Sequence, residues 1–222
     1  MRTEPAVECR GLVRTFIASS GRVDALRGIT VAFPANAITA VVGPSGSGKS
    51  SLLRILAGLD RPTEGTATIG ETEIARASSA DLRRHRRRVG YVFQRPSDNL
   101  ISYLTLREHI ELMARLRGVG TVDVEEVLGP LRLADRASHY PDQLSGGEQQ
   151  RAAFAQATLG DPPLVVADEP TAEIDSATAA SLLSMVSELP GRGLTLVIAT
   201  HDPEVIAIAD HAIHLHHGEL AR

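Results

Sequence analysis

Short apolar runs alternate with longer amphipathic stretches along the chain. Runs that contain few polar residues and are bounded by turn-forming ones predict buried strands. They cover residues 38–43 (ITAVVG), 89–94 (VGYVFQ), 163–170 (PLVVADEP), 194–202 (LTLVIATHD) and, ending in a turn, 211–220. A helix is expected from about Lys49 to Leu59. Because strands that are apolar throughout are buried on both faces, this pattern predicts a mostly parallel sheet with helices on both sides.

Two regions follow a different pattern. Residues 7–16 and 23–33 alternate between apolar and polar positions, which predicts an antiparallel β-layer near the N-terminus. Residues 95–158 show no strand pattern, and the helical period of 106–118 and 122–134 indicates an inserted helical subdomain. We therefore expect one α/β domain over 1–222, in which the core is formed by 1–94 and 159–222.

Composition narrows the classes of function. A chain of 222 residues suits one compact domain. The net charge of −4 and the aromatic content of 3% argue against nucleic acid as a partner. Cys9 is the single cysteine, so we expect a small buried residue and a reducing compartment. The sequence shows no secretory leader and no apolar run of the roughly 18 residues that a membrane span needs, which predicts a cytoplasmic protein.

The stretch GPSGSGKS (43–50) contains Lys49, the only lysine of the chain. It fits G-x-x-x-x-G-K-[ST] between a predicted strand and a predicted helix, the context that identifies a phosphate-binding loop. Glycines let backbone N–H groups surround a phosphate chain, and the lysine reaches the β- and γ-phosphates as a compact charge. The Ser50 hydroxyl is expected to bind Mg²⁺. The loop residues expected at the nucleotide are Gly43, Ser45, Gly46, Ser47, Gly48, Lys49, Ser50 and Ser51.

Two acids follow the apolar strand LVVA. Asp168 and Glu169 stand at its carboxyl end, where ligands bind in open α/β sheets. We expect Asp168 to hold Mg²⁺ through water and Glu169 to polarise the attacking water. On its own, such a pair can equally be a solvated turn; the phosphate loop favours the catalytic interpretation.

LSGGEQQR (144–151) resembles the signature motif of ATP-binding cassette (ABC) ATPases. Further motifs of that family stand in the family's order along essentially the whole chain. Residues 43–51 resemble the Walker A loop, Gln94 the Q-loop glutamine, LVVADEP the Walker B strand, AEID (172–175) the D-loop, His201 the switch histidine, and Phe16 the aromatic residue under adenine.

The resemblance implies a P-loop NTPase fold that hydrolyses ATP with Mg²⁺. Two cassettes, identical or homologous, would meet head to tail, and the signature of one would close the nucleotide site of the other. It implies that Gln94 joins Mg²⁺ to the helical subdomain, that His201 contacts the γ-phosphate, and that a separate integral membrane permease is driven from the inner face of the membrane. The residues implied at the partner's nucleotide are Ser145, Gly146, Gly147, Glu148 and, in the D-loop, Asp175.

SGGEQQR, with Glu148 where many cassettes have glutamine, is typical of the branch that serves lipoprotein release, macrolide export and related permeases. Glu173, Gln156 and the segment 95–105 depart from the usual pattern of the family. The identity of the permease is therefore left undetermined. Export is the expected role. The alternative is a non-transporting complex that controls cell-wall hydrolases or signals antibiotic stress. The run RRHRRR (83–88) predicts a solvated helix face, with contact to anionic lipid as the alternative.

Overall fold

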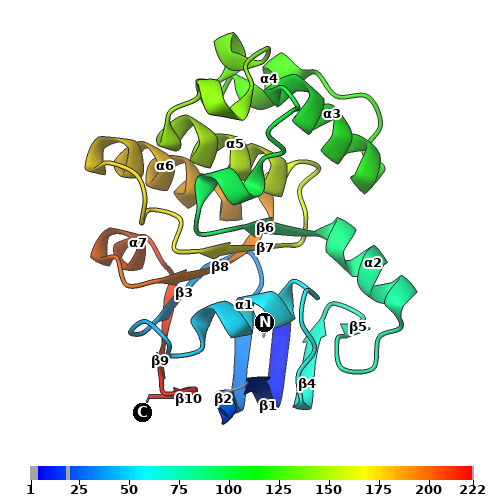
Figure 1. The fold of residues 1–222 in the computed structure, drawn as a ribbon, viewed down its shortest axis with the longest axis vertical. Helices are drawn as coiled ribbons and strands as arrows, with labels where there is room; N and C mark the ends of the chain where they lie inside the picture. Colours follow the sequence, from blue (N-terminus) through cyan, green and yellow to red (C-terminus); the bar gives the residue numbers. More distant parts are fainter. Residues whose placement is uncertain (1–4, 19–20, 222) are drawn as a thin grey trace.

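The fold is that of a computed structural model, which describes residues 5–18 and 21–221. A six-stranded sheet forms its centre, in the order β10-β9-β3-β8-β7-β6 (Figure 1). Its five longer strands pair in parallel and only the short β10 runs antiparallel, so the predicted mostly parallel sheet is confirmed. The strands are β3 Ile38–Val42, β6 Val89–Val92, β7 Leu164–Asp168, β8 Thr195–Thr200, β9 His211–His216 and β10 Glu219–Leu220.

The neighbouring strands β7 and β8 are buried along their whole length. Alternate residues of a strand point to opposite faces of the sheet. In β7, Leu164 and Val166 belong to one hydrophobic cluster, whereas Val165 and Ala167 belong to another on the opposite face. This double burial explains why these strands read as continuous apolar runs in the sequence.

A second sheet is antiparallel and has the order β2-β1-β4-β5. The predicted N-terminal β-layer is therefore confirmed, although sequence analysis missed its last two strands. Helix α1 (Lys49–Leu56) lies between the two sheets, where Leu52 and Leu56 share a core cluster with Phe33 of the antiparallel sheet. The strands of this sheet are β1 Pro5–Ala18, β2 Gly21–Pro34, β4 Glu64–Ile69 and β5 Thr72–Glu73.

Helix α1 ends at Leu56, three residues earlier than expected. Gly58 follows with a φ of 66°, in the left-handed region that ends helices. The helical pattern of 122–134 is interrupted for a different reason: α4 covers only Val124–Leu128, and Pro130, two residues later, cannot continue a helix.

Residues 93–163 contain helices and no strand, and the structure describes every one of them. Their shared core includes Ile110, Leu128 and Ala155. In Figure 1 the helices α3 and α4 lie at one end of the molecule, and α5 lies between them and the sheet. The helices of this part are η1 Pro96–Asn99, α3 Leu106–Arg117, α4, η2 Ala134–Arg136, η3 Pro141–Gln143 and α5 Gly146–Thr158.

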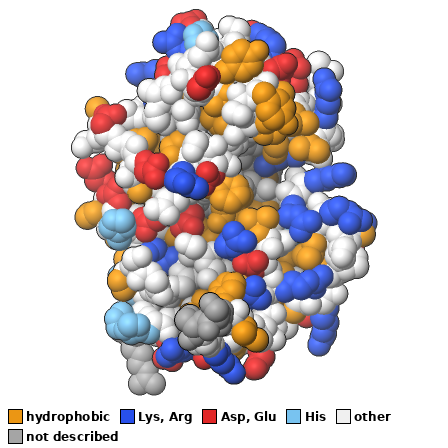
Figure 2. Space-filling view, viewed as in Figure 1, with side chains coloured by type: hydrophobic (Ala, Val, Ile, Leu, Met, Phe, Trp, Pro, Cys, Tyr) orange, Lys and Arg blue, Asp and Glu red, His pale blue; other side chains and the backbone are white. Residues whose placement is uncertain are grey.

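The remaining helices are α2 Ser79–Arg88, α6 Ser176–Glu188, η4 Leu189–Arg192 and α7 Pro203–Ala207. Helix α2 carries the arginine run: all five of its arginines are exposed, whereas His85 and Leu82 are buried. Arginine side chains gather on this side of the molecule (Figure 2). Of the helices within 5–18 and 21–221, none combines the length and apolar character needed to cross a membrane.

Candidate active site

Four segments with predicted site residues meet at one edge of the parallel sheet. The loop 43–48 follows β3, Glu169 follows β7, and His201 follows β8. Gln94 lies two residues beyond the end of β6. Because these strands are parallel, their carboxyl ends lie at the same edge, where ligands bind in open α/β sheets.

A cavity of about 680 Å³ lies at this edge. Nine of the predicted residues line it: Ser45, Gly46, Gly48, Lys49, Ser50, Ser51, Gln94, Glu169 and His201. The pocket is of the size that small-molecule sites usually have. Sequence reasoning missed three lining residues of β2, namely Val23, Asp24 and Ala25. Nothing in their local pattern points to the loop 43–48, and only the packing of β2 beside it brings them there.

The backbone of the loop 43–48 leaves no room for side chains at two of its glycines. A Cβ atom on Gly48 would lie 2.3 Å from the carbonyl oxygen of Ala25, and the φ of Gly48 is 103°. A Cβ atom on Gly43 would lie 2.2 Å from the carbonyl oxygen of Leu215. Gly43 and the buried Ser47, both predicted at the nucleotide, are not among the residues that line the cavity. The motif's glycines are required by close backbone contacts as well as by a ligand.

Lys49 is held at the base of the cavity. Its side chain is 6% exposed, and Nζ donates hydrogen bonds to the carbonyl oxygens of Gly43 (2.8 Å) and Pro44 (3.3 Å). Nζ also lies 3.3 Å from Oε1 of Glu169. The cation is thus surrounded by oxygen acceptors, and phosphate oxygens could replace these contacts.

Glu169 joins Lys49 to the switch histidine. Its Oε2 lies 2.9 Å from Nδ1 of His201 and accepts a hydrogen bond from the His201 backbone N–H at 3.3 Å. Its own N–H donates to the carbonyl oxygen of Ala199 at 2.8 Å. Glu169 has a φ of 46°, a left-handed conformation that is unfavourable for a residue with a side chain. Such strain persists where the surrounding structure enforces it, as at functional sites.

Asp168 is the last residue of β7, directly before the lining residue Glu169, and is 7% exposed. Burial raises its pKa above the usual value, and a hydrogen bond with Ser50 opposes the rise. Its Oδ1 atom is buried and has no hydrogen-bond partner in the described part of the chain. A buried carboxylate oxygen without a partner, beside a hydroxyl, is a donor set that suits Mg²⁺, which prefers oxygen ligands.

The signature segment lies apart from this cavity. Ser145 caps α5: its Oγ accepts from the Glu148 N–H at 3.3 Å, and the Glu148 carboxylate accepts from the Ser145 N–H at 2.8 Å. Among the described residues, neither Ser145, Gly146 and Gly147 nor Glu148 belongs to the cavity lining. One copy of the chain therefore does not bring its signature to its own phosphate loop.

The D-loop packs directly against the signature. Asp175 caps α6 by accepting the N–H groups of Ala177 and Thr178 at 3.1 Å each. A Cβ atom on Gly147 would lie 2.2 Å from Cγ2 of Thr178, so α5 and α6 touch where both helices begin. Asp175, like the signature, is not part of the cavity lining.

Phe16 lies beside the cavity on β1, paired with the lining residue Val23. Its side chain is partly exposed, and the Arg14 guanidinium lies 4.4 Å from its ring centroid, in a cation–π contact. Phe16 does not itself line the cavity. The structure therefore places the proposed adenine-stacking residue next to the phosphate site, with one ring face covered by Arg14.

Thr171 and Asp202 form a contact that sequence reasoning also missed. The Thr171 hydroxyl donates to Oδ2 of Asp202 at 2.7 Å. Thr171 follows Glu169 by two residues, and Asp202 directly follows His201. This bond is a second link between the segment after β7 and the segment after β8, in addition to the contact between Glu169 and His201.

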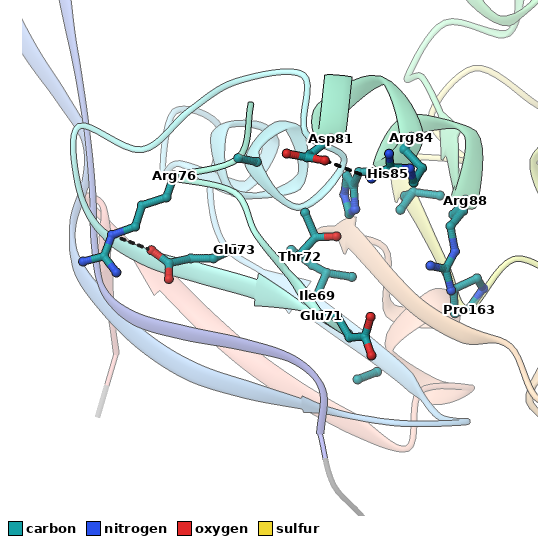
Figure 3. A pocket seen from close by; sticks show the side chains of 14 residues that line it. Ile69, Glu71, Thr72, Glu73, Arg76, Asp81, Arg84, His85, Arg88 and Pro163 are labelled. Atoms are coloured by element: carbon teal, nitrogen blue, oxygen red, sulfur yellow. Dashed lines mark hydrogen bonds and ion pairs between the residues drawn. The ribbon is translucent and has the colours of Figure 1, made fainter. Parts of the chain in front are cut away.

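A second cavity, of about 700 Å³, lies between β5 and α2 (Figure 3). None of the site residues predicted from the sequence lines it. Its acids are in part neutralised within its own wall, because Glu73 pairs with Arg76 and Asp81 pairs with Arg84. We therefore assign the chemistry to the cavity at the carboxyl edge of the sheet, despite the similar size of the two.

Comparison with protein families agrees with this assignment. Residues 26–172 match the family model described as ABC transporter. The chain belongs to the ABC transporter family. It is an ATP-hydrolysing cassette of that family, and the predicted family resemblance is confirmed. Its α/β fold is likewise the P-loop NTPase fold that was expected.

The chain is similar to two curated proteins called macrolide export ATP-binding/permease protein MacB, from Escherichia coli strain K12 and from Shigella dysenteriae serotype 1. Each is 37% identical over 223 residues, which is 98% of this chain and 34% of the relative. The chain thus spans about a third of the length of the curated relatives it matches.

Two solved cassette structures have the same fold. One is a dimeric post-hydrolysis state of the ATP-binding cassette MJ0796 bound to ADP and Pi, with a TM-score of 0.89 and 34% identity. The other, a dimeric structure of MJ0796 described as a bacterial ABC transporter cassette, has a TM-score of 0.88 and 33% identity. Each match covers 97% of both chains.

Proposed function

We propose that this cassette powers a membrane permease, with export as its direction, by ATP-driven head-to-tail dimerisation. The position of the signature segment carries the proposal, because that segment lies outside the cavity formed by its own chain. A second copy, or a homologous cassette, would supply the missing helix N-terminus. The dimeric structures of similar cassettes and the macrolide-export relatives support this view.

The residues of one copy have distinct proposed roles. The loop 43–48 and Lys49 bind the phosphates, and Phe16 stacks on adenine. Ser50, Gln94 and Asp168 hold Mg²⁺, which when bound would offset charge that develops on the phosphates. Glu169 orients and polarises the attacking water, and His201 contacts the γ-phosphate while fixing the Glu169 carboxylate. The 2.9 Å contact between Glu169 and His201 fits this pairing.

The residues of the second copy complete each site. Ser145, Gly146 and Gly147 offer N–H groups and a hydroxyl at the start of α5, where the helix dipole favours an anion. Asp175 would fix the D-loop at the same seam. Each dimer would then hold two ATP molecules between a phosphate loop and a signature.

The two parts of the chain would move relative to each other. We propose that residues 1–94 and 159–222 form the nucleotide-binding core and that about 95–158 form the helical subdomain. Gln94 lies at the boundary between the two parts and lines the cavity. A change at the nucleotide would therefore be transmitted through Gln94 to the helical part. The subdomain would contact the permease at the inner face of the membrane, and residues 95–105 would determine which permease is bound.

A Glu169→Gln variant tests the proposal. Without the carboxylate the variant should bind ATP, fail to hydrolyse it and accumulate as a closed dimer. Sedimentation velocity should show a monomer with ADP and a dimer with ATP. A variant that hydrolyses ATP at the wild-type rate would contradict the role of Glu169, and one that stays monomeric with ATP would contradict the dimer.

The tagged Glu169→Gln form, loaded with ATP, should also capture its partner from detergent-solubilised native membranes. We expect a stoichiometric polytopic protein, identified by mass spectrometry. A partner with a large extracytoplasmic domain and no substrate cavity would favour the regulatory alternative over export. Recovery of only water-soluble or ribosomal proteins would contradict the membrane function.

A further inference from the structure

The Glu148 carboxylate bridges two parts of the helical region. Its Oε1 lies 3.0 Å from Nε of Arg136, which ends η2. Its Oε2 accepts hydrogen bonds from the Ser145 N–H at 2.8 Å and from the Ser145 hydroxyl at 2.9 Å. Arg136, Glu148 and Ser145 of the signature are thus joined by one continuous series of polar contacts.

Arg136 is well placed to hold this arrangement. The neighbouring Leu133 and Ala137 are buried in the helical core, and the Arg136 N–H donates to the carbonyl oxygen of Leu133 at 2.9 Å. A second contact fastens the same loop to α5, because Nε of Arg151 donates to the carbonyl oxygen of Leu131 at 3.0 Å. The backbone of η2 is therefore fixed relative to the start of α5.

The charge on Glu148 creates a difficulty for anion binding. Hydrogen bonds from Ser145, together with Arg136, lower the pKa of Glu148, so this carboxylate is ionised at neutral pH. A negative charge at the first turn of α5 would repel a phosphate group that approaches the same N-terminus. The Arg136 guanidinium is the cation that offsets it.

We propose that Arg136 is a positioning residue for the ATPase reaction: it neutralises Glu148 and holds Ser145 ready for the γ-phosphate of the ATP bound to a second copy. The Ser145 hydroxyl has a single proton, which it now donates to Glu148. To bind the phosphate, the hydroxyl must donate this proton to the phosphate instead of to Glu148. The Glu148 carboxylate then still has its ion pair with Arg136. This inference rests on the proposed head-to-tail dimer.

A double-mutant cycle tests the proposal. Arg136→Gln should lower the ATPase rate per dimer about tenfold at low salt, since Glu148 is then an uncompensated charge. In a Glu148→Gln background the same Arg136→Gln change should lower the ATPase rate by less than about twofold, because no carboxylate remains to be neutralised. Arg136→Lys, which keeps the charge, should restore most of the lost rate. Equal losses in both backgrounds would overturn the proposal.

Two further readouts separate positioning from folding. ATP binding to the monomer should be unchanged in Arg136→Gln, because Arg136 does not line the cavity, whereas ATP-driven dimerisation in the Glu169→Gln background should weaken. Arg115→Gln, which removes an exposed cation from α3, is the matched control and should change neither property. A thermal midpoint of Arg136→Gln that falls by more than about 5 °C would instead indicate a structural role.

The dimerisation measurements also distinguish a failure of this inference from a failure of the proposed function. If the Glu169→Gln form with native Arg136 does not dimerise with ATP, the head-to-tail dimer itself is wrong. If it dimerises and Arg136→Gln dimerises equally well at low salt, only the role of Arg136 is wrong.

Discussion

Lys49 shows at the scale of one residue why shape matters as well as charge. Apart from Lys49, all the residues counted as Lys or Arg in this chain are arginine, yet the cation inside the phosphate loop is a lysine. Its ammonium group fits among the carbonyl oxygens of Gly43 and Pro44 and the Glu169 carboxylate. A planar guanidinium is wider and presents its donors in a rigid fork, so it does not fit the same space.

Replacing Lys49 by arginine therefore tests shape at constant charge. We expect Lys49→Arg and Lys49→Ala to lower ATP turnover by at least about a hundredfold. A charge-assisted hydrogen bond to phosphate contributes about 1.5–3 kcal/mol, so Lys49→Ala should also weaken ATP binding about tenfold or more. Steady-state hydrolysis and equilibrium binding measure both effects, with Arg115→Lys as the control. Wild-type turnover in Lys49→Arg would show that charge alone is sufficient.

Cys9 gives a second prediction at this scale. It is fully buried in the core of the antiparallel sheet, and burial raises its pKa to about 12. Because only the thiolate reacts, the folded protein should resist a thiol reagent at pH 8, whereas the protein unfolded in guanidinium should react with one equivalent. Rapid labelling of the folded form would contradict this burial.

At the scale of elements, the sequence predicted the segments whose pattern is local. Strands β7 and β8 were recognisable because both faces are covered, and the phosphate loop because its motif stands between β3 and α1. Strands β4 and β5 were missed because their residues are only partly buried, so they show no clear apolar run. Val23 and Asp24 were missed as site residues because only the packing of β2 brings them to the cavity.

Two buried histidines connect elements of the fold. Nε2 of His85, on α2, lies 2.8 Å from the carbonyl oxygen of Leu56, at the end of α1. In His109, Nδ1 lies 2.7 Å from the carbonyl oxygen of Thr105, and Nε2 accepts the Ile101 N–H at 2.8 Å. These bonds assign His109 the neutral form with its proton on Nδ1. Protonation of Nε2 would remove the acceptor for Ile101.

The two buried histidines should make the free energy of unfolding depend on pH. Burial lowers the pKa of both below the ordinary value of 6.5. Between that value and the lower folded-state pKa, the unfolded chain binds protons that the folded chain does not. The free energy of unfolding should therefore fall as pH drops below about 6.5. Urea unfolding at pH 7.5 and 5.5 measures it, and His109→Gln should reduce the difference. Exposed His214 is the control: an equal reduction in His214→Gln would contradict the assignment.

At the scale of the whole molecule, the phosphate-loop cavity and the signature segment lie apart within one chain. The cavity contains the phosphate loop, Glu169 and His201, whereas Ser145 caps α5 outside its lining. The motifs alone identified both halves, but their separation became visible only once the fold placed them. This arrangement is the physical reason to expect a dimer, since two copies can each complete the site of the other.

The most direct test of this claim mixes two inactive variants. Lys49→Ala removes the phosphate-loop cation of a copy, and Ser145→Arg blocks its signature; each variant alone should be inactive. In a head-to-tail dimer of one copy of each, the loop of the Ser145→Arg copy faces the native signature of the Lys49→Ala copy, so one site is intact. The account predicts that equimolar mixing restores ATP hydrolysis. If the mixture stays as inactive as its components, although both variants fold, the head-to-tail site is wrong.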